Sequence, residues 1–487
     1  MKTSFALAFV GGAVALVAAG CSGPHANKAG KTTRVTVLRM ANGYADFTYE
    51  PALAYFVDRV RQVSRGSLRI DVESDWGITH GIAQSGFEQR IVRDVADGKA
   101  ELGWVGTRTF DTLGVDSFQA LTAPMLIDSY PLERAVIASD IPHQMLASLA
   151  RLQLSGLAVL ADGLRKPIAV KRPLVSLADW QGITFASIRS RAQADAVRAL
   201  GAKPTDIWNA PLNDALAAGK VDGFEKNLLV YQINGTQEVA PYVTANVNLW
   251  PQTVALIAYP RRLAALSADE RAWIRQAAAD AAAHSTSLVD LDARSAAEAC
   301  KAGARFASAS ETVLASLRQA LAPVYRSLER DPQTKVFLAR IERLKRSTPP
   351  GPALAIPKRC MADSRTKPAH AVSATGGNPA VLNGVYRIKW SAKELLHAGA
   401  NWRYTHTNCG QRCVITMRLR NGHYMFCQGG SRGCIGIYTV SGNTVYLHGY
   451  FRARWSLRNG ELSFTDVISP DEGDKAFFGA KPWRKIG

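Results

Sequence analysis

The chain has 487 residues, more than one ordinary hydrophobic core accommodates, so its length indicates two or three domains. Its composition is 47% hydrophobic and 20% charged, which excludes a disordered or fibrous protein. The formal net charge is +19, and 19 Lys and Arg against 7 Asp and Glu place about +12 of it in residues 351–487.

The N-terminus predicts export. Lys2 precedes an apolar run from Phe5 to Ala19, which is too short for a confident membrane span. The run ends in Val17-Ala18-Ala19-Gly20-Cys21, which is similar to a bacterial lipobox, whose cysteine thiol receives a lipid such as palmitate. We expect residues 1–21 to be a lipoprotein signal peptide ending in lipidated Cys21, and residues 22–33 to be a tether. The mature chain would then lie in the cell envelope, outside the cytoplasm, lipid-anchored to the plasma membrane. An ordinary secretory signal with an incidental cysteine is the alternative.

Six cysteines remain when Cys21 is set aside, and an even number in an oxidising compartment favours disulfides. Four of them cluster near the C-terminus, namely Cys409, Cys413, Cys427 and Cys434. Their spacings, C-x3-C and C-x6-C, differ from the C-x2-C of a zinc knuckle, so we expect no metal. Cys300 and Cys360 are the natural remaining pair, and connectivity within the cluster stays open.

The first structured region alternates strand and helix patterns. Strand-like segments are expected at Val35–Met40, Leu68–Val72 and Leu102–Val105. Helical spacing of apolar residues covers Pro51–Val63 and the region of Glu88–Val95. This order predicts a largely parallel sheet with helices on both faces.

The pattern returns in the middle of the chain. Strand-like runs occur at Gly156–Leu160, Pro167–Val170 and Ile183–Phe185, and a helix is expected over Arg191–Leu200. Two α/β halves in tandem, followed by long helices, predict a two-lobed architecture over residues 34–345.

Two of the later helices have clear start signals. Ser267 and Glu270 form a capping-box pattern. Asp331 and Pro332 open another helix, and its apolar residues are expected on one face. These residues are Val336, Phe337, Ile341 and Leu344. Residues 346–378 are rich in Pro, Ser, Ala and Gly and are interpreted as a linker.

Short strands separated by turns follow in residues 379–487. Asn421-Gly422 and Asn459-Gly460 are hairpin signals, and the terminal Lys481–Gly487 is expected to be a closing strand. Leu382–Arg387 resembles the first strand of a lipocalin-like barrel, so we expect a small all-β, barrel-like domain. This domain would position the two-lobed domain or enclose a ligand of its own. Its basic charge, in an exported protein, favours anionic lipid or cell-wall polymer as a partner over nucleic acid, and a solvated basic surface is the alternative.

The stretch from Asp162 to Leu229 resembles the DctP-like solute-binding proteins of tripartite ATP-independent (TRAP) transporters. The resemblance rests on Ala199-Leu200-Gly201-Ala202, on Pro204-Thr205, and on Val221-Asp222-Gly223 with Glu225. It implies a type II periplasmic-binding-protein-like domain whose lobes close on a small-molecule solute, possibly an organic acid. It also implies membrane transporter subunits as partners.

The resemblance implies a site that departs from the family pattern. Gly163-Leu164-Arg165 matches the family's Gly-x-Arg, which makes Arg165 a carboxylate ligand, with a surface ion pair as the alternative. The principal family arginine falls on Ala186, and Arg189 or the nearby Arg191 would have to compensate for it, with solvated side chains as the alternative. The pocket asparagine falls on Lys226, and the pocket aromatic falls on Asn209, beside Trp208. Trp104, Trp208 and Trp250 are candidate cleft walls or core residues.

Two other functions compete with solute binding. An extracellular enzyme is disfavoured because no H-E-x-x-H, G-x-S-x-G or Walker-type motif occurs, and no cofactor is expected. An envelope adhesion protein that works through the basic C-terminal domain is the other alternative.

Overall fold

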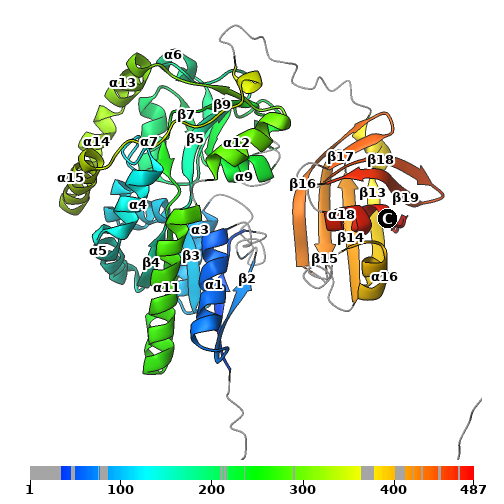
Figure 1. The fold of residues 1–487 in the computed structure, drawn as a ribbon, viewed down its shortest axis with the longest axis horizontal. Coiled ribbons are helices and arrows are strands. Elements are labelled where there is room, and N and C mark those ends of the chain that lie inside the picture. Colours follow the sequence, from blue (N-terminus) through cyan, green and yellow to red (C-terminus); the bar gives the residue numbers. More distant parts are fainter. Residues whose placement is uncertain are drawn as a thin grey trace, which may run out of the picture.

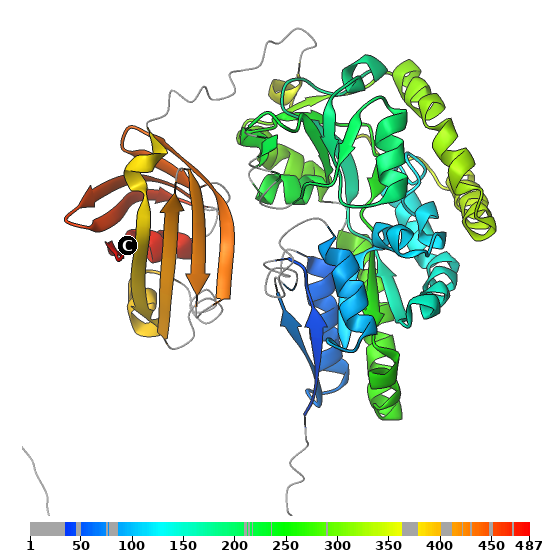
Figure 2. The same ribbon diagram turned by 180° about the vertical axis from the view of Figure 1, so that it is seen from behind.

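A computed structural model describes the following residues: 35–44, 50–74, 76, 86–208, 212, 215–216, 218–234, 236–288, 291–362, 378–400, 412–420, 422–428, 431–447, 451–469 and 472–487. They form an α/β body and a β-barrel (Figure 1 and Figure 2). The predicted signal peptide with Cys21, the tether, Cys409 and Asn209 lie outside the described residues. None of the helices in the described ranges has the length and apolarity needed to cross a bilayer.

The first lobe is built on a five-stranded sheet in the order β2-β1-β3-β11-β4. Its strands are β1 (Thr36–Ala41), β2 (Leu68–Glu73), β3 (Leu102–Gly106), β4 (Ser155–Leu160) and β11 (Val254–Ala258). β1 pairs in parallel with β2 and β3, as the sequence predicted. β11 enters between β3 and β4, antiparallel to both, from a segment almost 150 residues later than β3.

Helices cover both faces of this sheet, which confirms the expected layering. α1 (Pro51–Val63) and α11 (Ala268–Leu288) lie side by side on one face, and α3 (Phe87–Ala96) packs on the other (Figure 1). The capping box of α11 is formed in both directions: Glu270 N–H donates to Ser267 Oγ at 3.2 Å, and Ser267 N–H donates to Glu270 Oε2 at 2.8 Å.

The second lobe contains a seven-stranded sheet in the order β12-β9-β5-β8-β6-β7, with β10 paired to β5. Its strands are β5 (Leu164–Ala169), β6 (Thr184–Ala186), β7 (Lys203–Thr205), β8 (Gly223–Lys226), β9 (Tyr242–Thr244), β10 (Trp250–Pro251) and β12 (Arg305–Ala307). Its helices are α6 (Leu177–Trp180), α7 (Arg191–Ala199), α9 (Leu228–Ile233), α12 (Asp292–Lys301) and α13 (Glu311–Ala320).

Two short connections join the sheets of the two lobes. One runs from β4 to β5 through residues 161–163, and the other from β10 to β11 through residues 252–253. We call these two connections the hinge. Side chains at the hinge therefore lie where the lobes meet.

Further helices pack beside the lobes: α4 (Tyr130–Ala138), α5 (Ile141–Ala147), α10 (Pro260–Ala264), α14 (Ala322–Leu328) and α15 (Pro332–Ser347). Asp331 caps α15 by accepting from Thr334 N–H at 2.7 Å, as predicted. One expected core residue was wrong, because Val336 is 56% exposed. The buried face of α15 instead carries Phe337, Leu338 and Ile341, since Val336 lies one residue outside the i, i+4 row that faces the protein.

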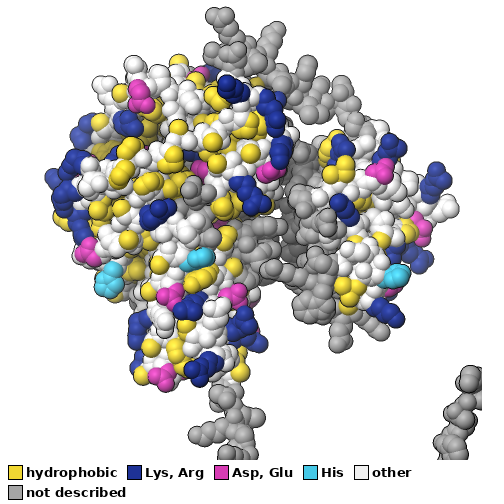
Figure 3. Space-filling view, viewed as in Figure 1, with side chains coloured by type: hydrophobic (Ala, Val, Ile, Leu, Met, Phe, Trp, Pro, Cys, Tyr) yellow, Lys and Arg dark blue, Asp and Glu magenta, His cyan; other side chains and the backbone are white. Residues whose placement is uncertain are grey.

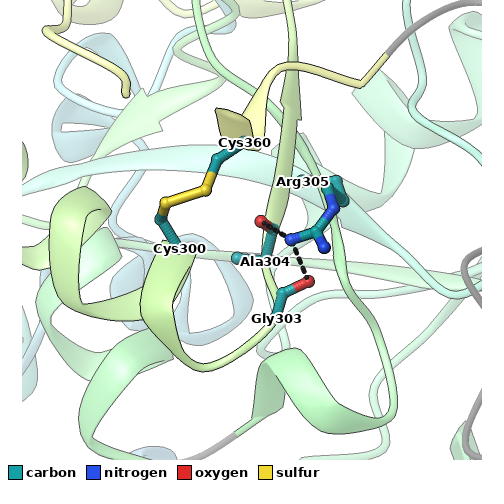
Figure 4. The surroundings of a disulfide bond; sticks show 5 residues. All are labelled: Cys300, Gly303, Ala304, Arg305 and Cys360. Carbon is teal, nitrogen blue, oxygen red and sulfur yellow. Dashed lines mark hydrogen bonds between the residues drawn. A yellow bond between two sulfur atoms is a disulfide. The ribbon is translucent and has the colours of Figure 1, made fainter. Parts of the chain in front are cut away.

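A disulfide joins Cys300 at the end of α12 to Cys360, which confirms the predicted pair (Figure 4). Beyond it, Ala362 N–H donates to Phe306 O at 2.6 Å, and Met361 forms a parallel bridge with Phe306 of β12. The segment that leaves the α/β body is thereby fixed to the second sheet.

The C-terminal residues form a closed antiparallel barrel of eight strands. These are β13 (Gly384–Ser391), β14 (Arg412–Arg420), β15 (His423–Gln428), β16 (Ser431–Ser441), β17 (Thr444–Leu447), β18 (Phe451–Arg458), β19 (Glu461–Ile468) and β20 (Trp483–Lys485). Cys413, Cys427 and Cys434 lie on β14, β15 and β16, and their side chains are outside the described set. The expected barrel is confirmed, whereas the lipocalin likeness stays a prediction.

Turn chemistry and aromatic packing specify the barrel. Asn459 and Gly460 both have positive φ, 50° and 76°, which is the type I′ geometry that joins β18 to β19. Helix α16 (Ala392–His397) follows β13, and α18 (Glu472–Gly479) carries Phe477 and Phe478 into the barrel core. The two α18 rings contact Phe451 and Trp483, so aromatic side chains fill this part of the interior.

Candidate functional site

The hinge carries a buried cluster of charged side chains centred on Arg165. Arg165 is the second residue of β5 and is 5% exposed. Its Nε donates to Glu225 Oε2, and its Nη2 donates to the Glu225 carbonyl at 3.2 Å. Its Nη1 donates to Gln252 Oε1 at 2.8 Å. Strand pairing places Glu225 beside Arg165, because β5 and β8 are adjacent and antiparallel.

A second arginine reaches the same glutamine from the first lobe. Arg108, which follows β3 in the 3₁₀ helix Thr107–Leu113, donates from Nη1 to Gln252 Oε1 at 2.9 Å. Its Nη2 donates to Glu88 Oε2 of α3 at 2.7 Å. Glu88 also accepts from Gly106 N–H and from Thr109 Oγ1. Gln252 therefore links arginines that belong to different lobes.

Lys226, at the end of β8, lies against aromatic rings. Its Nζ is 5.7 Å from the centre of the Trp208 ring and 5.5 Å from that of Phe224, and the Arg165 guanidinium lies 5.3 Å from the Trp208 ring. Cations at such distances are attracted to the faces of aromatic rings. Lys226 is 6% exposed, and burial, with a further contribution from Arg165, lowers its pKa to about 7.

The three cations of this cluster differ in their partners. Arg108 pairs with Glu88, and Arg165 pairs with Glu225, in ion pairs that are almost completely buried. Within the described ranges, Lys226 has neither a carboxylate partner nor a hydrogen-bond acceptor. A buried charge without a partner costs several kcal/mol, so an anion that binds beside Lys226 would relieve this cost.

A small pocket with a cavity volume of about 30 Å³ lies at the hinge. Residues of both lobes line it, among them Trp104 of β3, Asp162 and Gly163 of the hinge, and Asn227 before α9. Gly163 has a φ of +46°, and an added Cβ there would lie 2.8 Å from Asn227 Cβ. Only glycine fits this conformation and this close packing.

Carboxylates make one side of the pocket acidic. Burial, and then the charge of Asp162, raise the pKa of Glu50, and burial raises the pKa of Asp162 to about 6. Arg165 and Arg108 lie close enough to lower both pKa values, so the pocket and the arginine cluster form one electrostatic unit. Burial in turn lowers the pKa of Arg165 to about 10.

The structure brings several of the sequence-derived site residues together. Arg165, Trp208 and Lys226 are in contact, and Trp250 pairs with Arg165 across β10 and β5. Trp104 lines the pocket, stacks on Tyr44 with ring centres 5.1 Å apart, and donates from Nε1 to Asn42 Oδ1 at 3.0 Å.

The two arginines expected to compensate for Ala186 lie elsewhere. Arg189 is half-exposed and forms an ion pair of 2.7 Å with Asp206. Arg191 is likewise exposed and pairs with Asp116 at 2.7 Å. Neither belongs to the buried cluster around Arg165, because each is held by its own ion pair at the surface.

Sequence reasoning missed Glu88, Arg108 and Gln252. A signal for Arg108 was present, since it stands directly after β3, and ligands of α/β proteins bind outside the carboxyl ends of strands. Gln252 lies in a two-residue connection between strands of different lobes, and no local pattern marks it.

Comparison with known proteins identifies the family. The family model of the bacterial extracellular solute-binding proteins, family 7 (DctP), matches residues 42–331, more than half of the chain. The chain belongs to this family. As a family 7 protein it binds a solute outside the cytoplasm and is not an enzyme. The match covers most of the α/β body, from after β1 to the start of α15, and ends before the barrel.

Solved structures of TRAP periplasmic solute-binding proteins share the fold of this family 7 domain. One from Xanthobacter autotrophicus, with bound β-D-galacturonate, is 24% identical with a TM-score of 0.55 and covers 63% of this chain and 99% of its own. One from Chromohalobacter salexigens, with bound D-glucuronate, is 18% identical with a TM-score of 0.57 and the same coverage. One from Ralstonia eutropha, with bound (S)-2-acetolactate, is 19% identical, has a TM-score of 0.58, and covers 64% and 99%.

Proposed function

We propose that this family 7 protein captures a small organic anion at the hinge between its lobes and delivers it to a membrane transporter. The observation that carries the proposal is Lys226, a buried cation that has no counterion among the described residues, beside two arginines that are paired. An anionic ligand would supply the missing charge, and closure of the lobes around it would exclude water and strengthen the attraction.

The hydrogen-bonding capacity of the cluster supports an acid that also carries hydroxyl groups. Among the described residues, Arg108 Nε and Glu225 Oε1 are buried without a hydrogen-bond partner. Arg165 uses three of its five N–H groups within the protein. A carboxylate with neighbouring hydroxyls would satisfy such donors and acceptors together. The ligands named for the three structural relatives are all acids with an additional hydroxyl group.

The position of the cation distinguishes this chain from the family pattern. Ala186 stands where the resemblance places the principal arginine, and Lys226 stands where it places an asparagine. We infer that Lys226 takes over the anion contact, with Arg165 beside it and Trp208 as an aromatic wall. Four further residues stay candidate ligand residues, with less support than Lys226, Arg165 and Trp208. They are Trp104, Trp250, Arg189 and Asn209.

The remaining parts of the proposal concern the envelope. We propose that residues 1–21 are a lipoprotein signal, that the lipid on Cys21 anchors the chain to the plasma membrane, and that residues 22–33 are the tether. Residues 34–345 would be the solute-binding domain, residues 346–378 the linker, and residues 379–487 a lipocalin-like module. Transporter subunits would receive the solute.

Native mass spectrometry and calorimetric titration test the capture step. The chain from Ser22 onward, which retains every described residue, is screened with galacturonate, glucuronate and 2-acetolactate. We expect one ligand per chain, a loss of at least tenfold in affinity in Lys226→Met, and no change in Lys203→Met, whose side chain is exposed on β7.

Arg165→Ala serves as a second variant with a different signature. It should lose the ligand, but it also leaves Glu225 buried without its partner, which costs about 3–5 kcal/mol of stability. Undiminished binding by both variants would remove the cluster from the site. Failure of all acids to bind, together with binding of a cationic or neutral solute, would overturn the anion proposal.

A further inference from the structure

The outer surface of the barrel carries many basic side chains, and few of them form ion pairs among the described residues. Six consecutive strands, β13 to β18, contain no Asp or Glu. Figure 3 shows Lys and Arg side chains at several places on the visible surface of the barrel. We define the basic face as five exposed residues on three adjacent strands: Arg387 and Lys389 on β13, Arg418 and Arg420 on β14, and Arg484 on β20.

Strand register brings these charges close together. Arg387 lies directly opposite Arg484 in the β13–β20 pair. Arg418 pairs with Val385, two residues before Arg387 on the same surface. Like charges at such positions destabilise a sheet. Across the described ranges, no carboxylate pairs with any of these five residues, and Glu461, opposite Arg484 on β19, marks the edge of the basic face.

The opposite side of the barrel differs in this respect. Arg452, Arg454 and Arg458 are exposed on β18, four strands away from β14 around the closed barrel. Arg454 forms an ion pair with Asp466 at 3.4 Å, and Arg458 lies opposite Glu461 in the β18–β19 pair. Arg454 thus has an ion-pair partner, whereas none of the five residues of the basic face has one within the described ranges. Glu461 lies opposite both Arg458 and Arg484, so it does not distinguish the two sides.

Exposed apolar side chains border the basic face. Val414 is 46% exposed and lies opposite Lys389 on β14, and Ile486 is 45% exposed directly after β20. A charged polymer in solution would gain nothing from these side chains, whereas a bilayer surface accepts apolar groups just below its charged headgroups. Arginine also binds phosphate through its planar fork more specifically than lysine does.

We propose that the basic face docks onto the phosphate headgroups of an anionic lipid bilayer, with Val414 and Ile486 at the headgroup boundary. The docking needs no cavity inside the barrel, where aromatic side chains such as Phe451, Phe478 and Trp483 are already packed together. The inference concerns a different domain from the solute site and does not depend on which solute is bound.

Vesicle co-sedimentation tests the inference with the chain from Ser22 onward, which has no lipid anchor. Vesicles contain either equal parts of phosphatidylglycerol and phosphatidylcholine or phosphatidylcholine alone. We expect binding to the anionic vesicles only, weakened by salt because exposed charges are screened. Each basic residue near such a surface contributes about 1 kcal/mol, or roughly fivefold in affinity.

Two triple variants remove equal charge from the two sides of the barrel. The first variant combines Arg387→Gln, Arg418→Gln and Arg420→Gln, and it should lower vesicle affinity at least tenfold. The second combines Arg452→Gln, Arg454→Gln and Arg458→Gln, and it should lower vesicle affinity less than threefold. Since all six side chains are exposed, circular dichroism should report an intact barrel in both. Equal losses, or no binding by the unmodified chain, would overturn the inference. So would binding to a soluble glycerol-phosphate polymer without binding to the vesicles.

Discussion

Lys226 is the residue at which folding and binding conflict. Burial favours the neutral amine, whereas capture of an anion favours the ammonium ion. The aromatic faces of Trp208 and Phe224 offset part of the cost of the charge, but they supply no hydrogen-bond acceptor. An unliganded protein with this lysine is therefore less stable than one with an apolar side chain there, and the difference is the driving force that an anion can recover.

The conflict predicts opposite pH trends for affinity and stability. The pKa of Lys226 is about 7 in the folded protein and about 10.5 in the unfolded chain, so the stability of the unliganded protein rises with pH between these values. Affinity for an organic anion should instead be constant below pH 7 and weaken by up to about tenfold per pH unit above it. Calorimetric titration across this range checks the prediction.

Lys226→Met is the control for this pH dependence. The variant should unfold at a higher temperature than the unmodified chain below pH 7 and should show weak binding that no longer varies with pH. A pH dependence that survives in Lys226→Met would assign it to Glu50 or Asp162 instead.

Glu133, on α4 near the hinge, gives a second residue-scale prediction. It is completely buried, and burial together with the charge of Asp162 raises its pKa to about 8. Between pH 4.5 and 8 the unfolded chain releases this proton while the folded protein keeps it, so the stability of the protein falls as pH rises. Glu133→Gln should therefore gain stability relative to the unmodified chain by up to about 1.4 kcal/mol per pH unit in this interval. Chemical denaturation at pH 5 and pH 8 tests it, and an equal effect at both pH values would contradict it.

Part of the site could be predicted from single residues and part could not. Arg165 and Lys226 both lie in the stretch from Asp162 to Leu229 that resembles the family. Their proximity then follows from the pairing of β5 with β8. Glu88 and Arg108 lie far from that motif in sequence, and only tertiary packing brings them to Gln252. The exposure of Arg189 agrees with the solvated alternative, and its partner Asp206 lies outside any local pattern.

At the scale of elements, local signals were sufficient where capping or turn chemistry is specific. Residues within four positions of each other were enough to predict three features. These are the start of α11, the start of α15 and the turn between β18 and β19. The insertion of β11 between β3 and β4 did not follow, because its all-apolar sequence fits a buried strand in either sheet. β18 could have been predicted, because four apolar residues alternate along it with arginines and a serine, the pattern of a half-buried strand.

The Cys300–Cys360 disulfide provides the element-scale prediction. The bond closes a loop with a sequence separation of 60 and holds the segment that leaves the α/β body beside β12. Cys300→Ser with Cys360→Ser should lower the stability of the α/β body by about 2–4 kcal/mol, mainly because the unfolded chain gains freedom. Thermal unfolding of the oxidised protein and of the variant measures the difference. A reducing agent should abolish the difference, and its persistence would indicate that the serines disturb packing instead.

At the scale of the whole molecule, the chain contains distinct hydrophobic cores. Two clusters belong to the α/β body, and the barrel has a third that includes none of their residues. The family match ends before the barrel begins. Among the described residues, the solute site and the basic face thus lie in units with separate hydrophobic cores.

This separation predicts two transitions in differential scanning calorimetry of the chain from Ser22 onward. An organic anion at 100 times its Kd should stabilise the α/β body by about 2.7 kcal/mol through mass action, which raises only the transition of that body. The barrel transition should stay within about 1 °C, because none of the residues around Arg165 and Lys226 belongs to the barrel core. Lys226→Met should abolish the ligand-induced shift while leaving the barrel transition in place, and Arg387→Gln should affect neither the shift nor the α/β transition. A single cooperative transition that moves as a whole with the ligand would show instead that the two units are thermodynamically coupled, and the barrel would then have to be regarded as part of the capture mechanism.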